Sequence, residues 1–179
     1  MAFYCLYMTT LFSSQRLFFR EFTEGDAALV YALNKDPEVT RYLHELPTTD
    51  EAAALEVITK RILPQYQQYG YGRWAVLLKE NNTFIGWCGL KYRPERKETD
   101  LGYRFLRSCW GKGYASEAAA ACLLYGFEHY QLPLITARAH VENLASLRVI
   151  EKCGMQFSCL EEVDSCPVKT YQLRHPGLA

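Results

Sequence analysis

Residues 101–118 read LGYRFLRSCWGKGYASEA, and this stretch decides how the rest of the chain is interpreted. It begins in a predicted strand, TDLGYRFL at 99–106, and ends in a predicted helix, YASEAAAACLLYGFEHY at 114–130. The junction contains four small residues, Gly111, Gly113, Ala115 and Ser116. Because a helix N-terminus leaves backbone N–H groups unpaired, such a junction can bind an anion, most plausibly a pyrophosphate. A tight turn alone would also account for the two glycines.

Two familiar nucleotide-binding motifs do not fit this junction. The phosphate loop of nucleotide hydrolases requires G-x-x-x-x-G-K-[ST], which the stretch lacks. A dinucleotide-binding fold requires G-x-G-x-x-G, and Ser116 stands where the third glycine belongs. The nearest acidic residue after the following strand, Glu142, lies too far along the chain for the ribose contact of that fold.

Composition limits the classes of function that remain. The 179 residues suffice for one domain with one sizeable core. Lys+Arg and Asp+Glu both number 20, and this zero net charge argues against broad nucleic-acid binding. Seven scattered cysteines without a C-x-x-C pair predict reduced thiols in a cytoplasmic protein, with no disulfide framework and no metal site. No run approaches the ~20 apolar residues of a membrane span, so no membrane partner is expected.

The first half of the chain predicts one strand and two helices. RLFFREF at 16–22 has strand character, and Thr23 then precedes a capped helix at 26–34. Asp36-Pro37 breaks that helix. Thr48, followed three residues later by Glu51, marks the start of a second helix, in which Pro64 is expected to cause a kink or an end.

The second half predicts six strands and two helices. WAVLLKE at 74–80 and TFIGWCGLKY at 83–92 form a β-hairpin, followed by the strand and helix already described. A strand at 133–140 leads to a helix at 143–154, with Asn143 as N-cap and Gly154 past its end. Two last strands lie within 155–163 and 167–175. The sum is one α/β sandwich around a mixed sheet, with an N-terminal extension at 1–14, a single domain at 15–174 and a tail at 175–179.

Four segments in this order resemble the GCN5-related N-acetyltransferases. More closely, they resemble the branch of bacterial ribosomal-protein N-terminal acetyltransferases, which also includes acetyltransferases of small amines. The segments are QRLFFREFTEGDAALVYALNKDPEVTRYL at 15–43, FIGWCGL at 84–90, LGYRFLRSCWGKGYASEA at 101–118 and NLASLRVIEKCGMQF at 143–157. The resemblance implies the GNAT fold, an α/β (α+β) three-layer sandwich whose twisted, mixed and mostly antiparallel sheet has about six to seven strands.

The resemblance also implies acetyl-CoA as co-substrate and direct transfer to an amine acceptor, without metal. It implies that the coenzyme lies on the backbone of the junction, at Gly111, Lys112, Gly113, Tyr114, Ala115 and Ser116, and on main-chain groups around Phe105 and Leu106. Asn143, besides capping its helix, is a candidate to hydrogen-bond the pantetheine or a water near the thioester. The expected acceptor is a protein N-terminal amine. A small amine, such as a polyamine or aminoglycoside, and a coenzyme-binding module without turnover remain alternatives. A monomer and a homodimer are both compatible with the sequence.

Catalytic residues are suggested less directly. Many family members carry a proton-donating tyrosine seven residues after the asparagine that starts the last helix, and Ile150 stands there in this chain. Ser146, one turn earlier, is the predicted substitute. Asp100 is a candidate to accept the proton of the amine, or it pairs with a basic neighbour. By analogy, Tyr42 and His44 are expected at the acceptor pocket. The aromatic side chains near the hairpin could wall that pocket or simply fill the core: Tyr71, Trp74, Trp87 and Tyr92.

Overall fold

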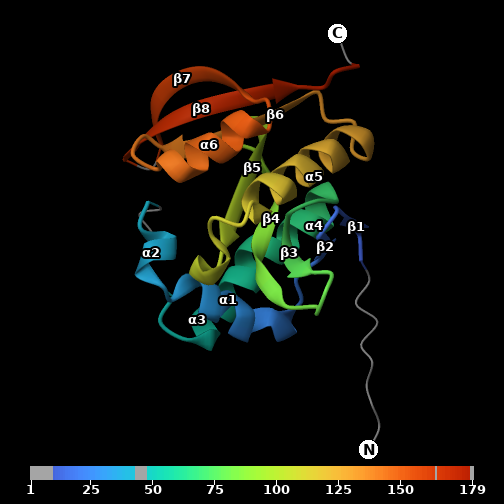
Figure 1. Cartoon of the computed structure of the whole chain (residues 1–179), viewed down its shortest axis with the longest axis vertical. Helices are drawn as coiled ribbons and strands as arrows, with labels where there is room; N and C mark the ends of the chain where they lie inside the picture. The colour runs from blue at the N-terminus through green and yellow to red at the C-terminus, as the bar shows by residue number, and fades with distance from the viewer. Residues whose placement is uncertain (1–9, 43–47, 164, 178–179) are drawn as a thin grey trace, which may run out of the picture.

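One sheet of eight strands runs through the part of the chain that the computed structural model describes, which is residues 10–42, 48–163 and 165–177 (Figure 1). The strand order is β1-β2-β3-β4-β5-β6-β8-β7. The bounds are Phe12–Ser13 (β1), Leu17–Arg20 (β2), Arg73–Leu78 (β3), Phe84–Arg93 (β4), Glu98–Phe105 (β5), Leu134–His140 (β6), Gln156–Val163 (β7) and Cys166–Arg174 (β8).

The predicted mixed, mostly antiparallel sheet is confirmed, with a slightly higher strand count. All neighbouring pairs are antiparallel except β5 and β6, which are parallel. The additional strand is β1, which comes from the segment predicted as an extension. Its Phe12 stacks on the Phe19 ring of β2, with ring centroids 4.3 Å apart, and this contact joins β1 to β2.

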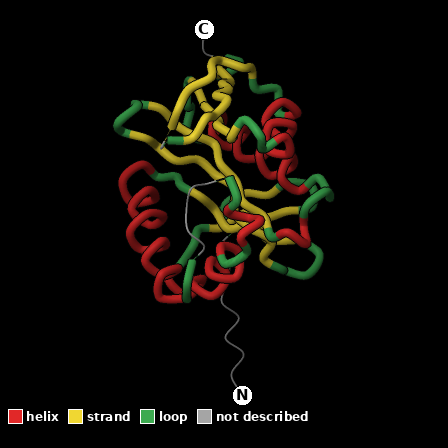
Figure 2. The backbone as a smooth tube through the Cα atoms, turned by 90° about the vertical axis from the view of Figure 1, so that its left-hand side faces the viewer, coloured by secondary structure: helices red, strands yellow, loops and turns green. Residues whose placement is uncertain are grey.

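Helices cover both faces of the sheet, which gives the three predicted layers (Figure 2). On one face lie α1 (Ala27–Asn34), α3 (Glu51–Val57) and α4 (Leu63–Tyr69), with the short α2 (Pro37–Thr40) nearby. On the other lie α5 (Tyr114–Glu128) and α6 (Leu144–Lys152). Two apolar clusters fill the spaces between the layers, one between the sheet and α5 and α6, the other between the sheet and α1 and α3.

Local details of the first helices differ from the sequence prediction. Thr23 does cap with Asp26, whose carboxylate accepts the Thr23 N–H at 2.8 Å. The second helix is capped by Asp50 and not by Thr48, because the Asp50 carboxylate accepts the Ala53 N–H at 2.8 Å. The helix does not end at Pro64: a π-helical turn at Ile58–Ile62 comes first, and Pro64 lies in the first turn of α4.

The parallel pair β5 and β6 is short, and this positions the site. It is paired at only three positions, from Thr99–Ile135 to Leu101–Ala137. Strand β5 then stays paired with β4 as far as Phe105, whereas β6 separates from it. The edge of β5 from residue 102 to 105 is therefore open to a ligand.

No helix in the described ranges is long and apolar enough to cross a membrane.

Candidate functional site

A cavity of about 850 Å³ opens where β5 and β6 separate. It is lined by the ends of β5 and β6, the loop before α5, the first turns of α6, and α2. The predicted site residues Asp100, Phe105, Gly111, Gly113, Tyr114, Ala115, Ser116, Asn143 and Ser146 all line it. Leu106 and Lys112 are not among the lining residues.

The loop before α5 offers unpaired backbone N–H groups. Gly111 and Gly113 adopt positive φ values of 74° and 80°, which turn the chain sharply into the helix. Within the described parts of the chain, no protein acceptor takes a hydrogen bond from the N–H groups of residues 111–116. A Cβ atom added at Gly111 would meet no protein atom within 4 Å, so that side of the loop is open. These donors, reinforced by the helix dipole of α5, suit an anionic group.

The turn between β1 and β2 braces this loop from behind. Glu117, in the first turn of α5, accepts hydrogen bonds from the Arg16 N–H at 2.7 Å, from Arg16 Nε at 2.6 Å and from Ser14 Oγ at 2.7 Å. Arg16 Nη1 also donates to the Lys112 carbonyl at 3.1 Å. Burial alone would raise the pKa of Glu117, but the hydrogen bonds from Arg16 and Ser14 outweigh it, and the pKa is lowered. The carboxylate therefore stays charged and fixes the loop.

The open edge of β5 carries one of the two expected main-chain donors. The Leu106 N–H already donates to the Ile85 carbonyl at 2.9 Å, so it points toward β4 and away from the open edge. The Phe105 carbonyl accepts the Trp110 indole N–H at 2.8 Å, so it faces away from β4. Because the N–H and C=O of one residue in a strand point to the same side, the Phe105 N–H faces the cavity.

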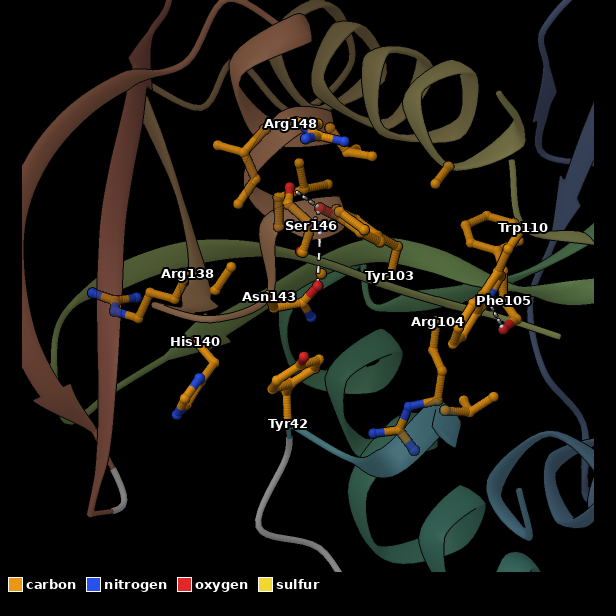
Figure 3. Close-up of a pocket in the computed structure, with 18 of the residues that line it drawn as sticks. Tyr42, Tyr103, Arg104, Phe105, Trp110, Arg138, His140, Asn143, Ser146 and Arg148 are labelled. Carbon is orange, nitrogen blue, oxygen red and sulfur yellow. Dashed lines mark hydrogen bonds between the residues drawn. The ribbon is translucent and has the colours of Figure 1, made fainter. Parts of the chain in front are cut away.

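Ser146 forms a pair with a tyrosine that the sequence argument did not single out (Figure 3). The Tyr103 hydroxyl lies 2.8 Å from Ser146 Oγ and donates to the Ser146 carbonyl at 2.9 Å. Asn143 caps α6, because its side-chain oxygen accepts the Ser146 N–H at 3.1 Å. Burial raises the pKa of Tyr103, so its hydroxyl stays protonated. Ile150, where the family tyrosine is usual, is buried in the core.

Asp100 lies among three arginines. Its carboxylate is 2.7 Å from Arg73 Nη2, 3.7 Å from Arg93 Nη2 and 3.6 Å from Arg138 Nη1. A Cβ atom at Gly102 would come within 2.6 Å of the Arg73 guanidinium, so a glycine is needed for Arg73 to reach Asp100. Of the two alternatives left open by the sequence, pairing with basic neighbours is observed, and a catalytic role for Asp100 stays a prediction.

Some of the remaining predicted residues line the cavity, and others pack in the hydrophobic core. Tyr42 lines the cavity and stacks on His140, with ring centroids 5.5 Å apart. His44 lies outside the described residues. Of the aromatic side chains near the hairpin, Trp87 lines the cavity, whereas Trp74 is fully buried in the core. Tyr71 also packs in the core, and Tyr92 packs against it.

The described residues hold no group of metal ligands, and the Cys153 thiol, which contacts the first turn of α5, is held in its protonated form. No group of three or more metal-ligating side chains occurs among residues 10–42, 48–163 and 165–177. The Cys153 thiol donates to the Ser116 carbonyl at 3.8 Å, and burial, with a smaller contribution from Cys88, raises its pKa to about 11. A thiol that stays protonated at neutral pH is a poor nucleophile.

Tyr103, Arg16 and Glu117 are the residues that the sequence argument missed. Tyr103 and Arg16 lie inside segments quoted for the resemblance, but neither fits a motif with a known mechanism. Their roles depend on partners 43 and 101 residues away in the chain, and no periodicity or spacing in a single sequence signals such contacts.

Comparison with known proteins agrees with this geometry. A model of the acetyltransferase (GNAT) domain family matches residues 16–156. An uncharacterized N-acetyltransferase, p20, from Bacillus licheniformis is 32% identical over 151 residues, which cover 83% of each chain.

Solved structures give the same picture. An acetyltransferase of the GNAT family from Bacillus anthracis has a TM-score of 0.76 at 28% identity, covering 91% of this chain and 97% of the other. A spermidine N-acetyltransferase from Vibrio cholerae, in complex with CoA and spermine, has a TM-score of 0.75 at 21% identity, covering 89% and 96%. A ribosomal L7/L12 alpha-N-protein acetyltransferase, in complex with coenzyme A, has a TM-score of 0.77 at 17% identity, covering 92% and 97%.

Proposed function

This chain belongs to the GNAT family and is an N-acetyltransferase, and from that premise we propose that it transfers an acetyl group from acetyl-CoA to a primary amine in a ternary complex. The observation that carries the proposal is the row of unpaired N–H groups at residues 111–116, at the N-terminus of a 15-residue helix. Because these donors open onto the gap between β5 and β6, one elongated ligand can occupy both places.

The residues present fit coenzyme A in character. The backbone of Gly111, Gly113, Tyr114, Ala115 and Ser116 would hold its pyrophosphate, and the open edge of β5 would hold the pantetheine arm as an added strand holds its neighbour. Lys112 contributes backbone only, because its side chain lies outside the cavity. When bound, acetyl-CoA supplies the activated acetyl group.

Three groups of this chain then act on the reaction. The Phe105 N–H polarises the carbonyl that the amine attacks. The Ser146 hydroxyl donates a proton to the departing sulfur, and the Tyr103 hydroxyl, 2.8 Å away, orients the Ser146 hydroxyl. Water, which takes up the proton of the amine, returns a proton to Ser146. Asp100, committed to its arginines, holds the wall of the acceptor side in place. The amine loses its proton to water, which is feasible for an α-amine with a pKa near ~8.

A protein N-terminal amine is the first candidate acceptor, as in the ribosomal-protein branch that the sequence resembles. Support comes from the similarity to an alpha-N-protein acetyltransferase. A small amine is the second candidate, because a spermidine N-acetyltransferase matches with nearly the same TM-score. Both similarities lie below 25% identity and show the fold alone, so the charge of the acceptor side has to decide between them.

The proposal is tested by measuring coenzyme A binding by calorimetry and thiol release from acetyl-CoA with a panel of peptides and amines. The wild-type chain is expected to bind coenzyme A and to release thiol only when an acceptor is present. Gly113→Glu, at a φ of 80° and with its Cβ atom 3.5 Å from Arg16 Nη2, would distort the loop and is expected to abolish both. Unchanged binding by Gly113→Glu would remove the loop from the proposal. Tight binding with no turnover on any acceptor would instead indicate a binding module.

A further inference from the structure

On the α1 side of the sheet, most of the paired side chains of β4 and β5 are charged. Register places Trp87 opposite Arg104, Lys91 opposite Asp100, and Arg93 opposite Glu98. Paired residues share a face, and Arg104 donates to Asn34 of α1, so this is the face toward α1. Figure 3 shows Arg104, Tyr42 and His140 on this side of β5, whereas Tyr103, Ser146 and Arg148 lie on the α6 side.

Positive charge dominates the cavity wall. Among the described residues that line the cavity, six arginines and one lysine stand against the carboxylates of Glu38, Asp100 and Glu142. Arg148 and Lys152 lie on α6, on the coenzyme side. The α1 side still holds Arg41, Arg73, Arg93, Arg104 and Arg138. An acceptor with additional positive charges would meet these guanidinium groups directly.

Three carboxylates on or behind the α1 side are already hydrogen-bonded to arginines. Asp100 is held by Arg73 at 2.7 Å. Glu98 and Glu161, behind the cavity wall, hold Arg138 at 2.7 and 2.9 Å. Glu38 lies 3.7 Å from Arg41, beyond hydrogen-bond distance, at the α2 end of the cavity. The carboxylates nearest Arg93 are therefore not free partners for a cationic ligand.

Arg93 has donors left for a ligand. Its guanidinium nitrogens come no closer to a carboxylate than 3.7 Å at Asp100 and 3.8 Å at Glu95, beyond hydrogen-bond distance. Its Nε atom is buried and has no hydrogen-bond partner in the described part of the chain. The positive field here is also felt by neighbouring Lys91, whose pKa is lowered by burial and then by Arg93 and Arg73.

His140 adds another donor. Its Nδ1 accepts the Glu142 N–H at 3.2 Å, so the neutral ring carries its proton on Nε2 and offers an N–H to the cavity.

We propose that the acceptor is a primary amine that also carries an anionic group, a carboxylate or a phosphate, and that Arg93 binds this group on the α1 side of the cavity. This rests on the proposed acetyl transfer and names its substrate class. A polyamine is disfavoured by the same charges.

The test compares acceptors that differ in one anionic group. The pairs are γ-aminobutyrate and γ-aminobutyramide, aminopropyl phosphate and aminopropanol, and the C-terminally amidated peptides Ser-Asp-Ala-Ala and Ser-Asn-Ala-Ala, with spermidine as the cationic acceptor. In each pair that reacts, we expect kcat/KM to be about tenfold or more higher for the anionic member. The pair with the highest kcat/KM shows whether the anionic acceptor is a peptide or a small molecule. Equal rates within every pair, or spermidine as the best acceptor, would overturn the proposal.

Variants assign the effect to Arg93. Arg93→Gln is expected to reduce the preference within each pair to about twofold or less, while coenzyme A affinity stays as in the wild type. Arg93→Glu is expected to reverse the preference toward spermidine. Arg174→Gln makes the same charge change at an exposed site away from the cavity and should keep the wild-type preference. An unaltered preference in both Arg93 variants would remove Arg93 from the site.

A binding measurement separates this proposal from the proposed function. The chain saturated with coenzyme A is titrated calorimetrically with γ-aminobutyrate, γ-aminobutyramide, aminopropyl phosphate and aminopropanol. Tighter binding of the anionic members, lost in Arg93→Gln, supports the anion site even if no acceptor turns over, in which case only the acetyl transfer fails. Equal binding within both pairs, alongside measurable turnover, contradicts the anion site alone.

Discussion

Arg16 and Glu117 are 101 residues apart in the chain, yet Arg16 donates to the Glu117 carboxylate from both its backbone N–H and its Nε, at 2.7 and 2.6 Å. This contact joins the turn before β2 to the first turn of α5. Since the N–H groups that precede α5 are the proposed pyrophosphate site, the ion pair holds the geometry of that site without taking part in the chemistry.

Removing the charge of Glu117 is expected to weaken coenzyme binding. In Glu117→Gln, hydrogen bonds to a charged acceptor become hydrogen bonds to a neutral one. This change should lower the free energy that holds the loop in its binding conformation by about 1 kcal/mol or more. We expect the KM for acetyl-CoA to rise about fivefold or more with kcat nearly unchanged. Glu128→Gln, at the exposed C-terminal end of α5, is the control and should leave both constants as in the wild type. A fall in kcat alone would contradict the bracing role.

The hydroxyl pair of Tyr103 and Ser146 is expected to act as a unit. Ser146→Ala should lower kcat about tenfold, since the departing sulfur loses its proton donor. Tyr103→Phe should lower kcat as well, and the double variant should lose little more than Ser146→Ala, because both hydroxyls serve one proton transfer. The KM for acetyl-CoA should change by about twofold or less. Additive losses in kcat would show independent roles, and Tyr92→Phe, outside the cavity, is the control.

Asp100→Asn is expected to act through stability and not through proton abstraction. Breaking a buried pair with Arg73 should lower the free energy of unfolding by about 3 kcal/mol. The folded fraction should keep the wild-type pH dependence of kcat/KM, which stopped-flow or thiol-release assays can follow. If the limb of the profile on the acidic side disappeared, Asp100 would be the general base after all.

Gly111→Ala should distinguish the effect of backbone strain on stability from the effect of an added methyl group on coenzyme A binding. An alanine at φ of 74° costs about 1–2 kcal/mol of stability, and its methyl group meets no protein atom within 4 Å. Gly154, at φ of 77° after α6, is equally open and lies outside the cavity lining, so Gly154→Ala is a matched control. Both variants should lose similar stability in urea unfolding, but only Gly111→Ala should weaken coenzyme A binding in calorimetry.

Glu161 should make stability depend on acid pH. Burial alone would raise its pKa, but hydrogen bonds from Thr170, Arg96 and Arg138 lower it from 4.5 to about 2. The stabilisation is therefore complete above about pH 4.5 and is lost as the pH falls toward 2. After allowance for solvent screening it should amount to about 1 kcal/mol.

The matching measurement is urea unfolding of Glu161→Gln and the wild type at several pH values. The difference in unfolding free energy should be largest near neutral pH and should vanish toward pH 2. Glu162→Gln, at the exposed neighbouring position, should show no such pH-dependent difference. A difference that stayed constant with pH would exclude the charged form of Glu161 as the cause.

Several features of the fold were predictable because their signals are local. Strand alternation, the turn at Asn81 and Asn82, and the Asn143 cap gave the order of the elements and the mixed sheet. The helix through Pro64 was less predictable, because a π-helical turn that precedes a proline has no composition signal. The Leu106 N–H was expected at the open edge of β5, but it donates to the Ile85 carbonyl of β4. That bond depends on the register between β4 and β5, which a single sequence does not reveal.

The sequence by itself determined the sharp turn at residues 111–116 and the strand and helix on either side of it. It could do so because helix caps and positive-φ positions depend on near neighbours in the chain. The tertiary structure alone decided which side chains meet: Tyr103 with Ser146, Arg16 with Glu117, and Asp100 with its arginines. The pairs made by Tyr103 and by Asp100 depend on where β5 and β6 separate and on which face each residue occupies. Both are properties of strand register, which forms only when distant segments pack together.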